Sequence, residues 1–407
     1  MMLVEKHIIN KNHSFYNECD SLCLKSKNLY NQGLYNVRQH YFENKKYLNY
    51  VDNFHKSKSC ESYKELPAKV SNQTLKLVDQ NFKSFFSLLK KKNGGGYKEK
   101  IKIPQYLDKI NGRCVIKYEK QALGLRHFKK TGNILLSKTD IKINTKINDW
   151  SLIKEVRIVP RNCFYVIEVV YERKEKNNNN TVIAAIDPGL NNLTTITFNN
   201  GITPLIINGK PLKSINQYYN KKRSKLQSEL EKKQKSKKSK SIIKLINKRN
   251  NKVNDYLHKA SRLLVNQLVS NSVKTLVMGK NIGQKQDINI GKRNNQNFVQ
   301  IPIFKLLEMI KYKCELEGIN VIIQEESYTS KASFLNMDTI PKYLKGDNKK
   351  HEFSGYRFNR GLYKIRGKKI FINADVNGSY NILRKAIPNA FVDGIEGFAV
   401  NPIKLNV

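Results

Sequence analysis

Two aspartates that lie far apart in the sequence have the surroundings of a shared metal site. Asp187 ends a run of β-forming residues, Val182–Ile186, and a Pro-Gly pair follows it, as is typical of a buried strand that runs into a turn. Asp375 follows a short apolar strand, Ile370–Ile372, and begins a helix-like stretch. Asp187 alone would equally suit an ordinary strand-to-turn position. Because Mg²⁺ is held by carboxylates and phosphate oxygens, the pair predicts a divalent-metal site.

The residues around both aspartates resemble those of a known family. The stretch D-P-G-L-N-N-L-T-T begins at Asp187, and N-A-D-V-N-G-S-Y-N-I-L begins at Asn373. They closely resemble the first and third RuvC motifs of TnpB, an insertion-sequence protein related to type V CRISPR effectors and to the eukaryotic Fanzor proteins. The resemblance extends over nearly the whole chain. It implies that Asp187 and Asp375 are catalytic ligands of Mg²⁺.

The same resemblance implies an α+β multidomain fold built around a RuvC-like (RNase H-type) α/β nuclease domain. From the residues alone, the polar stretch E-R-K-E-K-N-N-N-N after Tyr171 predicts the clearest domain boundary. The expected parts are a small β-barrel wedge domain (1–13 and 96–175), a helical recognition domain (14–95), the nuclease domain (181–329 and 370–390), a basic target-nucleic-acid-binding insertion (330–369) and a C-terminal tail (391–407).

A third acid is missing from its usual place. In most TnpB proteins the strand matching Thr275–Met278 is followed by a glutamate, whereas this chain has Gly279. Either the nuclease is inactive, or the acid comes from elsewhere. The strand that starts near Gly318 ends in Glu325 and Glu326, and a neighbouring strand about 4.8 Å away is within reach of a glutamate side chain.

Of these two glutamates, we favour Glu326 as the third catalytic and metal-binding residue and keep Glu325 as the second candidate. Successive strand residues face opposite sides of a sheet, so only one of the two can face the aspartates. Fanzor proteins resemble this chain here, because they carry an acid three residues before a Thr-Ser pair, and that position is Glu326.

Composition points to a polyanionic partner. The 407 residues include 75 Lys or Arg and 33 Asp or Glu, a formal net charge of +42. Such a charge would oppose compaction unless a polyanion screens it, so we expect nucleic-acid binding that weakens with salt. A basic bias of an AT-rich genome is the alternative, but bias alone would raise Lys and Glu together.

Two sets of polar residues are candidates for nucleic-acid contacts. A predicted helix from Pro67 carries one polar face, which is either solvated or, as its similarity to a TnpB recognition-lobe helix implies, reads the DNA flanking motif. Basic segments further on would contact nucleic-acid backbones, although Tyr218–Lys252 could also be a solvated loop. The motif-reading residues are Gln73, Lys76, Gln80 and Lys83, and the backbone contacts are Lys221, Lys222, Arg223, Arg357, Arg360 and Arg366.

Cysteine usage predicts reduced thiols and no zinc site. The six cysteines form no C-x-x-C pair, and none falls in 330–369, where TnpB proteins normally carry a four-cysteine zinc ribbon. The N-terminal residues contain no long apolar run, so we expect no membrane partner and a cytoplasmic, nucleoid-associated bacterial location.

The resemblance thus implies an RNA-guided DNA endonuclease of a transposable element. It would cleave double-stranded target DNA beside a short flanking motif, using two Mg²⁺ ions held by Asp187, Glu326 and Asp375. The guide RNA would be transcribed from the element's end, and the protein would act as a monomer in complex with it. The alternatives are a nuclease-inactive, RNA-guided transcriptional repressor and a transposase that joins DNA strands itself.

Overall fold

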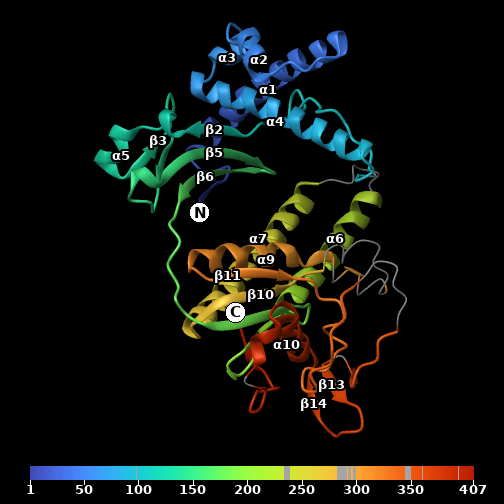
Figure 1. The fold of residues 1–407 in the computed structure, drawn as a ribbon. Helices are drawn as coiled ribbons and strands as arrows, with labels where there is room; N and C mark the ends of the chain where they lie inside the picture. The colour runs from blue at the N-terminus through green and yellow to red at the C-terminus, as the bar shows by residue number, and fades with distance from the viewer. Residues whose placement is uncertain are drawn as a thin grey trace. The chain divides into compact units, whose positions relative to one another are not determined.

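The computed structural model divides into two compact units, Met1–Lys174 and Glu175–Val407 (Figure 1). It describes residues 1–97, 99–232, 239–281, 291, 295–296, 299–343, 350–359, 361–392 and 394–407. The basic residue Arg360 therefore lies outside the described residues. Within the described helices, none is long and apolar enough to cross a membrane.

The first unit combines an antiparallel sheet with a helical part. The sheet has the order β1 (Met2–Ile9), β6 (Phe164–Glu172), β5 (Ile153–Arg161) and β2 (Ile116–Glu119). Strand β1 runs antiparallel to β6, and β5 and β6 form a hairpin. Strands β3 (Asn133–Leu135) and β4 (Lys142–Asn144) form a separate ladder. The described strands of this unit thus pair as a four-stranded sheet and a two-stranded ladder.

The helices of the first unit bury apolar residues that recur at helical spacing. On α4 these residues include Leu75, Val78 and Phe82, all fully buried, as the pattern after Pro67 predicts. Cys19 and Cys23 lie one turn apart on the buried face of α1. The helices are α1 (Tyr16–Asn44), α2 (Tyr50–Ser57), α3 (Glu61–Lys64), α4 (Ala68–Asn93) and α5 (Leu125–Thr131).

The second unit is built on a six-stranded mixed sheet. Strands β7 (Val182–Pro188), β8 (Asn192–Phe198) and β9 (Leu205–Asn208) form an antiparallel meander. Strand β10 (Val273–Gly279) lies parallel to β7, and β11 (Asn320–Gln324) lies parallel to β10. On the far edge, β15 (Ile403–Leu405) pairs in parallel with β9. The end of the segment expected to be a tail therefore extends this sheet.

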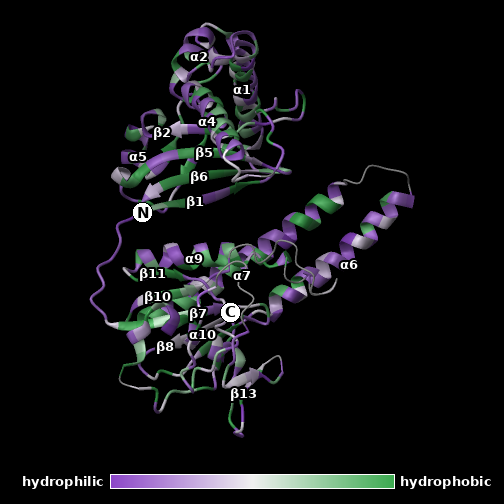
Figure 2. Cartoon of the chain, turned by 45° about the vertical axis from the view of Figure 1, so that its right-hand side comes forward, coloured by the Kyte–Doolittle hydropathy of each residue, from purple (hydrophilic) through white to green (hydrophobic). Residues whose placement is uncertain are grey.

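Helices cover both faces of this sheet, and the alternation of side chains along each strand decides which residues contact which helices. Helices α7 (Lys240–Ser270) and α9 (Ile303–Leu316) pack with Ala184 and Ile186 in one apolar cluster. Helix α10 (Ala374–Ala386) packs with Ala185 and Val277 on the opposite face (Figures 1 and 2). Since side chains alternate along a strand, Asp187 and Gly279 belong to the α10 face.

The remaining elements of the second unit lie outside the sheet. Helix α6 (Lys210–Lys232) packs against α7, and the two helices contain most of the predicted basic segment Tyr218–Lys252, of which 233–238 lie outside the described residues. A small antiparallel sheet of β12 (Gly355–Arg357), β13 (Leu362–Ile365) and β14 (Phe371–Asn373) leads directly into α10. This small sheet brings the basic residues around Arg357 beside the helix that carries Asp375.

Candidate active site

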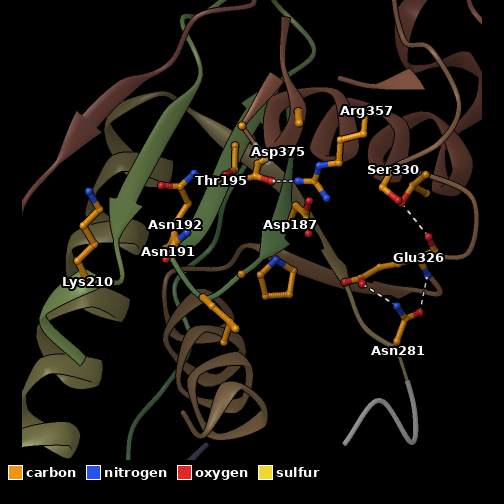
Figure 3. A pocket seen from close by; sticks show the side chains of 16 residues that line it. Asp187, Asn191, Asn192, Thr195, Lys210, Asn281, Glu326, Ser330, Arg357 and Asp375 are labelled. Carbon is orange, nitrogen blue, oxygen red and sulfur yellow. Dashed lines mark hydrogen bonds and ion pairs between the residues drawn. The ribbon is translucent and has the colours of Figure 1, made fainter. Parts of the chain in front are cut away.

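A cavity of about 580 Å³ opens where β7, β11 and α10 approach one another. Its lining includes Asp187, Glu326 and Asp375, three acids separated by up to 188 residues in the chain. Figure 3 shows their side chains with the polar residues that surround them. Those neighbours are Asn191, Asn192, Thr195, Lys210, Asn281, Thr329, Ser330 and Arg357.

Asp187 is held against α10 by a close approach that requires a glycine. Asp187 lies one residue before the end of β7, a central strand, on the face of the sheet that α10 covers. A Cβ atom placed on Gly378 would lie 2.7 Å from Oδ2 of Asp187. Any side chain at position 378 would therefore push the helix away from this carboxylate.

Glu326 reaches the same face from the neighbouring strand. Gly279 pairs with Gln324, and a Cβ atom placed on Gly279 would lie 2.4 Å from Oε1 of Glu326. The carboxylate of Glu326 thus occupies the space that a side chain at position 279 would fill. Asn281 donates from Nδ2 to Oε2 of Glu326 at 2.9 Å, which orients the carboxylate.

The loop after Glu326 is fastened by asparagines of α10. Asn377 donates to the carbonyl oxygen of Ala332 at 2.8 Å, and Asn381 donates to those of Thr329 and Ala332 at 2.8 and 2.7 Å. Both asparagines are fully buried, so these bonds satisfy backbone groups that would otherwise be costly to bury. The residues around the third motif therefore position Glu326 as well as Asp375.

Asp375 lies in the first turn of α10 and is held by two donors. Asn192 Nδ2 donates to its Oδ2 at 2.7 Å, and the Arg357 guanidinium donates to its Oδ1 at 2.9 Å. The helix itself begins at Asn373, whose side chain accepts from the backbone N–H groups of Asp375 and Val376. Such an N-cap is stabilising and fixes the first turn that presents the carboxylate.

Burial and neighbouring negative charges raise the pKa values of two of the acids. Burial, followed by the charges of Glu326 and Asp375, raises the pKa of Asp187 well above its ordinary value. Burial, followed by the charge of Glu325, raises the pKa of Glu326 to about 7. A cation placed between these carboxylates would favour their charged forms, and perturbed acids gathered in a cavity mark candidate functional sites.

The donor set suits a hard divalent cation. Oε1 of Glu326 is buried and has no hydrogen-bond partner in the part of the chain that the structure describes. Carboxylate and amide oxygens are the ligands that Mg²⁺ prefers. Among the described residues, however, no three His, Cys, Asp or Glu side chains are grouped closely enough to hold one ion together.

Glu325, the second candidate, faces a different cavity. Its carboxylate pairs with Lys385 Nζ at 2.8 Å, and its side chain is 45% exposed. That cavity is lined by residues that include Gln324, Arg384 and Lys385, and neither of the two aspartates lines it. The structure thus brings Glu326, and not Glu325, to Asp187 and Asp375.

The predicted motif-reading face of α4 divides into two pairs. Gln73 donates to Glu119 and is half-buried, and the half-buried Lys76 has its ammonium 5.7 Å from the ring centre of Tyr50. Gln80 and Lys83 are exposed, and Lys83 pairs with Asp79 at 2.8 Å. Gln80 and Lys83 are therefore the more accessible half of this face.

The predicted backbone-binding residues occupy two places in the second unit. Lys221, Lys222 and Arg223 are exposed on α6. Arg366 is exposed near the small sheet, with its guanidinium 5.9 Å from the ring centre of Tyr356. Arg357 differs from the expectation, because its guanidinium enters the acidic cavity and pairs with Asp375.

Sequence reasoning missed several polar residues of the cavity. Asn192 follows Asp187 within the first motif, so its place in that motif was an available signal. Asn281 lies two residues after Gly279, where the strand ends. Lys210 begins α6 and lines the cavity on the side of Asn191 (Figure 3). No local pattern marks Asn281 or Lys210, since only the packing of separate strands and helices brings them to the cavity.

Comparisons with known proteins agree with these motifs. The OrfB_IS605 family model, described as a probable transposase, matches residues 165–284, and the model of the Cas12f1-like TNB domain matches residues 304–382. A TnpB-like protein of Methanocaldococcus jannaschii is 29% identical over 196 residues, which cover 46% of this chain and 65% of that protein. The match therefore spans less than two thirds of that relative's length.

A solved structure shares the fold. In the cryo-EM structure of a Cas12f1–sgRNA–target DNA complex, the matching chain has a TM-score of 0.52 and 14% sequence identity. The match covers 90% of this chain and 83% of that one. Both aspartate motifs fall inside the matched family models, Asp187 in the first and Asp375 in the second. The chain is a mixed α/β protein of more than one domain, and its sequence is similar to OrfB_IS605 probable transposases, to Cas12f1-like TNB domains and to a TnpB-like protein.

Proposed function

We propose that this protein is an RNA-guided DNA endonuclease in which Asp187, Glu326 and Asp375 form the catalytic centre. One observation carries the proposal: the carboxylate of Glu326 occupies the space above Gly279, beside the two motif aspartates. The glutamate missing from the end of β10 is thereby replaced from the neighbouring strand. A chain that had lost catalysis would have no need to gather three carboxylates at one cavity, since like charges held close together repel one another.

The residues of the cavity have distinct roles in this proposal. Asp187, Glu326 and Asp375 would hold two Mg²⁺ ions, which when bound activate water and stabilise the leaving oxygen of a phosphodiester. Asn281 and Asn192 orient Glu326 and Asp375 through the hydrogen bonds described above. Arg357 and Lys210 line the same cavity and supply positive charge for the scissile phosphate of the target strand.

The remaining parts would handle the two nucleic acids. The guide RNA is transcribed from the end of the transposable element and selects double-stranded target DNA by base pairing, and the protein reads a short flanking motif. Residues 14–95 form the recognition domain, with Gln80 and Lys83 toward that motif. Residues 1–13 and 96–175 form the wedge domain, and 330–369 form a basic insertion without zinc. The protein acts as a monomer with its RNA, in the cytoplasm at the nucleoid.

Single-turnover cleavage by four RNA-bound proteins tests the proposal: the parent, Asp187→Ala, Glu326→Gln and Glu325→Gln. Removing one preorganised electrostatic group typically costs about 10²- to 10³-fold in rate, so we expect Asp187→Ala and Glu326→Gln to lose at least that much. Glu325→Gln is the matched control, because it makes the same chemical change at an adjacent, half-exposed residue. It should retain cleavage within about tenfold of the parent.

The outcomes separate the parts of the proposal. RNA and target binding should be the same in all four proteins, because neither depends on these carboxylates. If Glu326→Gln cleaves like the parent, Glu326 is not the third acid. If the parent binds RNA and target DNA but never cleaves with Mg²⁺, the protein is an RNA-guided DNA-binding repressor instead.

A further inference from the structure

A second cavity lies in the basic helical hairpin of the second unit, between α6 and α7. Its volume is about 230 Å³, and it shares no lining residue with the acidic cavity. Both helices project from the sheet as a neighbouring pair (Figure 2). The proposed catalytic centre makes no use of this cavity.

The wall of this cavity combines apolar, aromatic and cationic side chains. Ile215 and Leu245 supply the apolar part, and Tyr218 and Tyr219 supply two rings. Three cations complete it, and no acid is among the lining residues, which are Ser214, Ile215, Tyr218, Tyr219, Leu245, Lys248, Arg249 and Lys252. A ligand with an aromatic ring and a negative charge would match this wall.

One side of the cavity is rigid. Arg249 donates to Asn216 Oδ1 at 2.8 Å and to the carbonyl oxygen of Gln300 at 2.7 Å. Its guanidinium lies 5.7 Å from the ring centre of Tyr219, within the range of a cation–π contact. Arg249 and Tyr219 are therefore held in place before any ligand arrives, which lowers the entropic cost of binding.

The other side is open to solvent. Tyr218 is 59% exposed, although burial of a tyrosine ring is favourable. Lys222 lies 6.0 Å from the centre of that ring. Lys248 and Lys252 are also exposed and form no ion pair with any residue that the structure describes. An exposed ring and two unpaired cations are thus available to a ligand.

We propose that this cavity binds one nucleotide of a nucleic acid strand, with the base stacked on Tyr218 and the adjoining phosphates on Lys248 and Lys252. Base–aromatic stacking combined with a basic groove is how proteins hold single-stranded nucleic acid. The described parts of the surrounding segment, 221–232 and 239–252, contain ten Lys or Arg and only two acids, so positive charge for further phosphates of the strand lies close to the cavity in the chain. The inference rests on the proposed nucleic-acid partners but does not depend on cleavage.

Two measurements on the full chain test this site. Binding is measured with a mixed-sequence 20-nucleotide RNA and with a DNA of the same sequence. Stacking on one aromatic ring corresponds to about 5- to 150-fold in affinity, so Tyr218→Leu should weaken binding of one of the two strands by that factor. Tyr218→Phe keeps the ring and should bind within about twofold of the parent. Photo-crosslinking with 4-thiouridine RNA and 5-bromodeoxyuridine DNA then identifies the strand that leaves an adduct on α6 or α7.

Matched controls remove the simpler explanations. Tyr35→Leu changes another exposed tyrosine, 51% exposed, that lines none of the cavities described here. Lys244→Gln removes a charge one turn before Lys248 on the same helix and outside this cavity. Losing one phosphate contact on a single strand should reduce the slope of log affinity against log salt concentration by about 0.7, and we expect this for Lys248→Gln. Lys244→Gln should reduce that slope by less. Unchanged melting temperatures of the variants establish that they are folded.

Failure of this inference is distinguishable from failure of the proposed function. If the parent binds nucleic acid and Tyr218→Leu binds the RNA and the DNA as tightly as the parent does, the nucleotide site is refuted and the proposed function stands. The absence of adducts on α6 and α7 in both crosslinking experiments would lead to the same conclusion. A parent protein that binds neither strand at low salt would overturn both.

Discussion

Replacing Gly279 with alanine should displace the carboxylate of Glu326. The added methyl group would lie 2.4 Å from Oε1 and 3.0 Å from Cδ of Glu326, and 2.7 Å from Cδ1 of Ile382. Ordinary contact begins at 3.4 Å, so the carboxylate must move by about 1 Å, and a misplacement of about 1 Å can cost about a hundredfold in rate. We expect Gly279→Ala to cleave about a hundredfold more slowly than the parent while binding RNA and target DNA normally.

The same substitution should change stability in a way that depends on Glu326. Forcing a methyl group into a packed region typically costs about 1–3 kcal/mol, and replacing a glycine inside a strand recovers about 0.5–1 kcal/mol of this. A net cost of about 1–2 kcal/mol lowers the melting temperature of a unit of this size by roughly 2–8 °C. In a Glu326→Ala background the main obstacle is gone, so Gly279→Ala should cost little there.

The assay is therefore a cycle of four proteins: parent, each single variant and the double variant. Each is measured by thermal unfolding in the absence of nucleic acid and by single-turnover cleavage with it. If Gly279→Ala cleaves at the parent rate and melts at the parent temperature, the Glu326 carboxylate does not lie above Gly279. Equal melting-temperature losses in both backgrounds would likewise refute this placement.

Three further predictions concern other parts of the chain. Gln80→Ala should relax the flanking-motif preference in a cleavage library with randomised flanks and leave RNA binding unchanged, whereas an unaltered preference would exclude this face of α4. Protein purified at low salt should carry RNA, and for six to ten phosphate contacts its affinity should fall about 10³- to 10⁵-fold between about 50 and 200 mM salt. Recovery of RNA-free, monodisperse protein at low salt would contradict this. Finally, burial lowers the pKa of Lys313 from 10.5 to about 8. The unfolded chain therefore binds more protons than the folded chain between these values, so stability should rise as pH increases from about 8 to 10.5. Relative to Lys313→Met, the free energy of unfolding should increase with pH over this range, and parallel pH profiles of the two proteins would refute it.

Local sequence carried the information for the two aspartates. Asp187 and Asp375 each stand at the junction of an apolar strand with a turn or a helix start, and such junctions can be recognised within about ten residues. The parity of a strand then predicted that only one of Glu325 and Glu326 could face them, and the structure places Glu326 in their cavity. Parity is a local rule, because it follows from the geometry of one extended chain.

Other features could not be predicted because they depend on contacts between distant segments. Arg357 was expected at a nucleic-acid backbone, but the small sheet β12–β14 brings its guanidinium to Asp375. The segment after 391 has no strong strand pattern, yet Ile403–Leu405 pairs with β9 at the open edge of the sheet. An exposed strand edge offers unpaired backbone groups to any segment that can reach it, whatever that segment's own propensity.

By itself, the sequence determined the net charge of +42, the two motif aspartates and the alternation that separates Glu325 from Glu326. Only the tertiary structure decided that the carboxylate of Glu326 fills the space above Gly279, that Gly378 admits Asp187 against α10, and that the exposed Tyr218 shares a cavity with Lys248 and Lys252. The physical reason is that charge and periodicity are properties of neighbouring residues. Occupied and vacant space arises only when strands and helices far apart in the chain pack together.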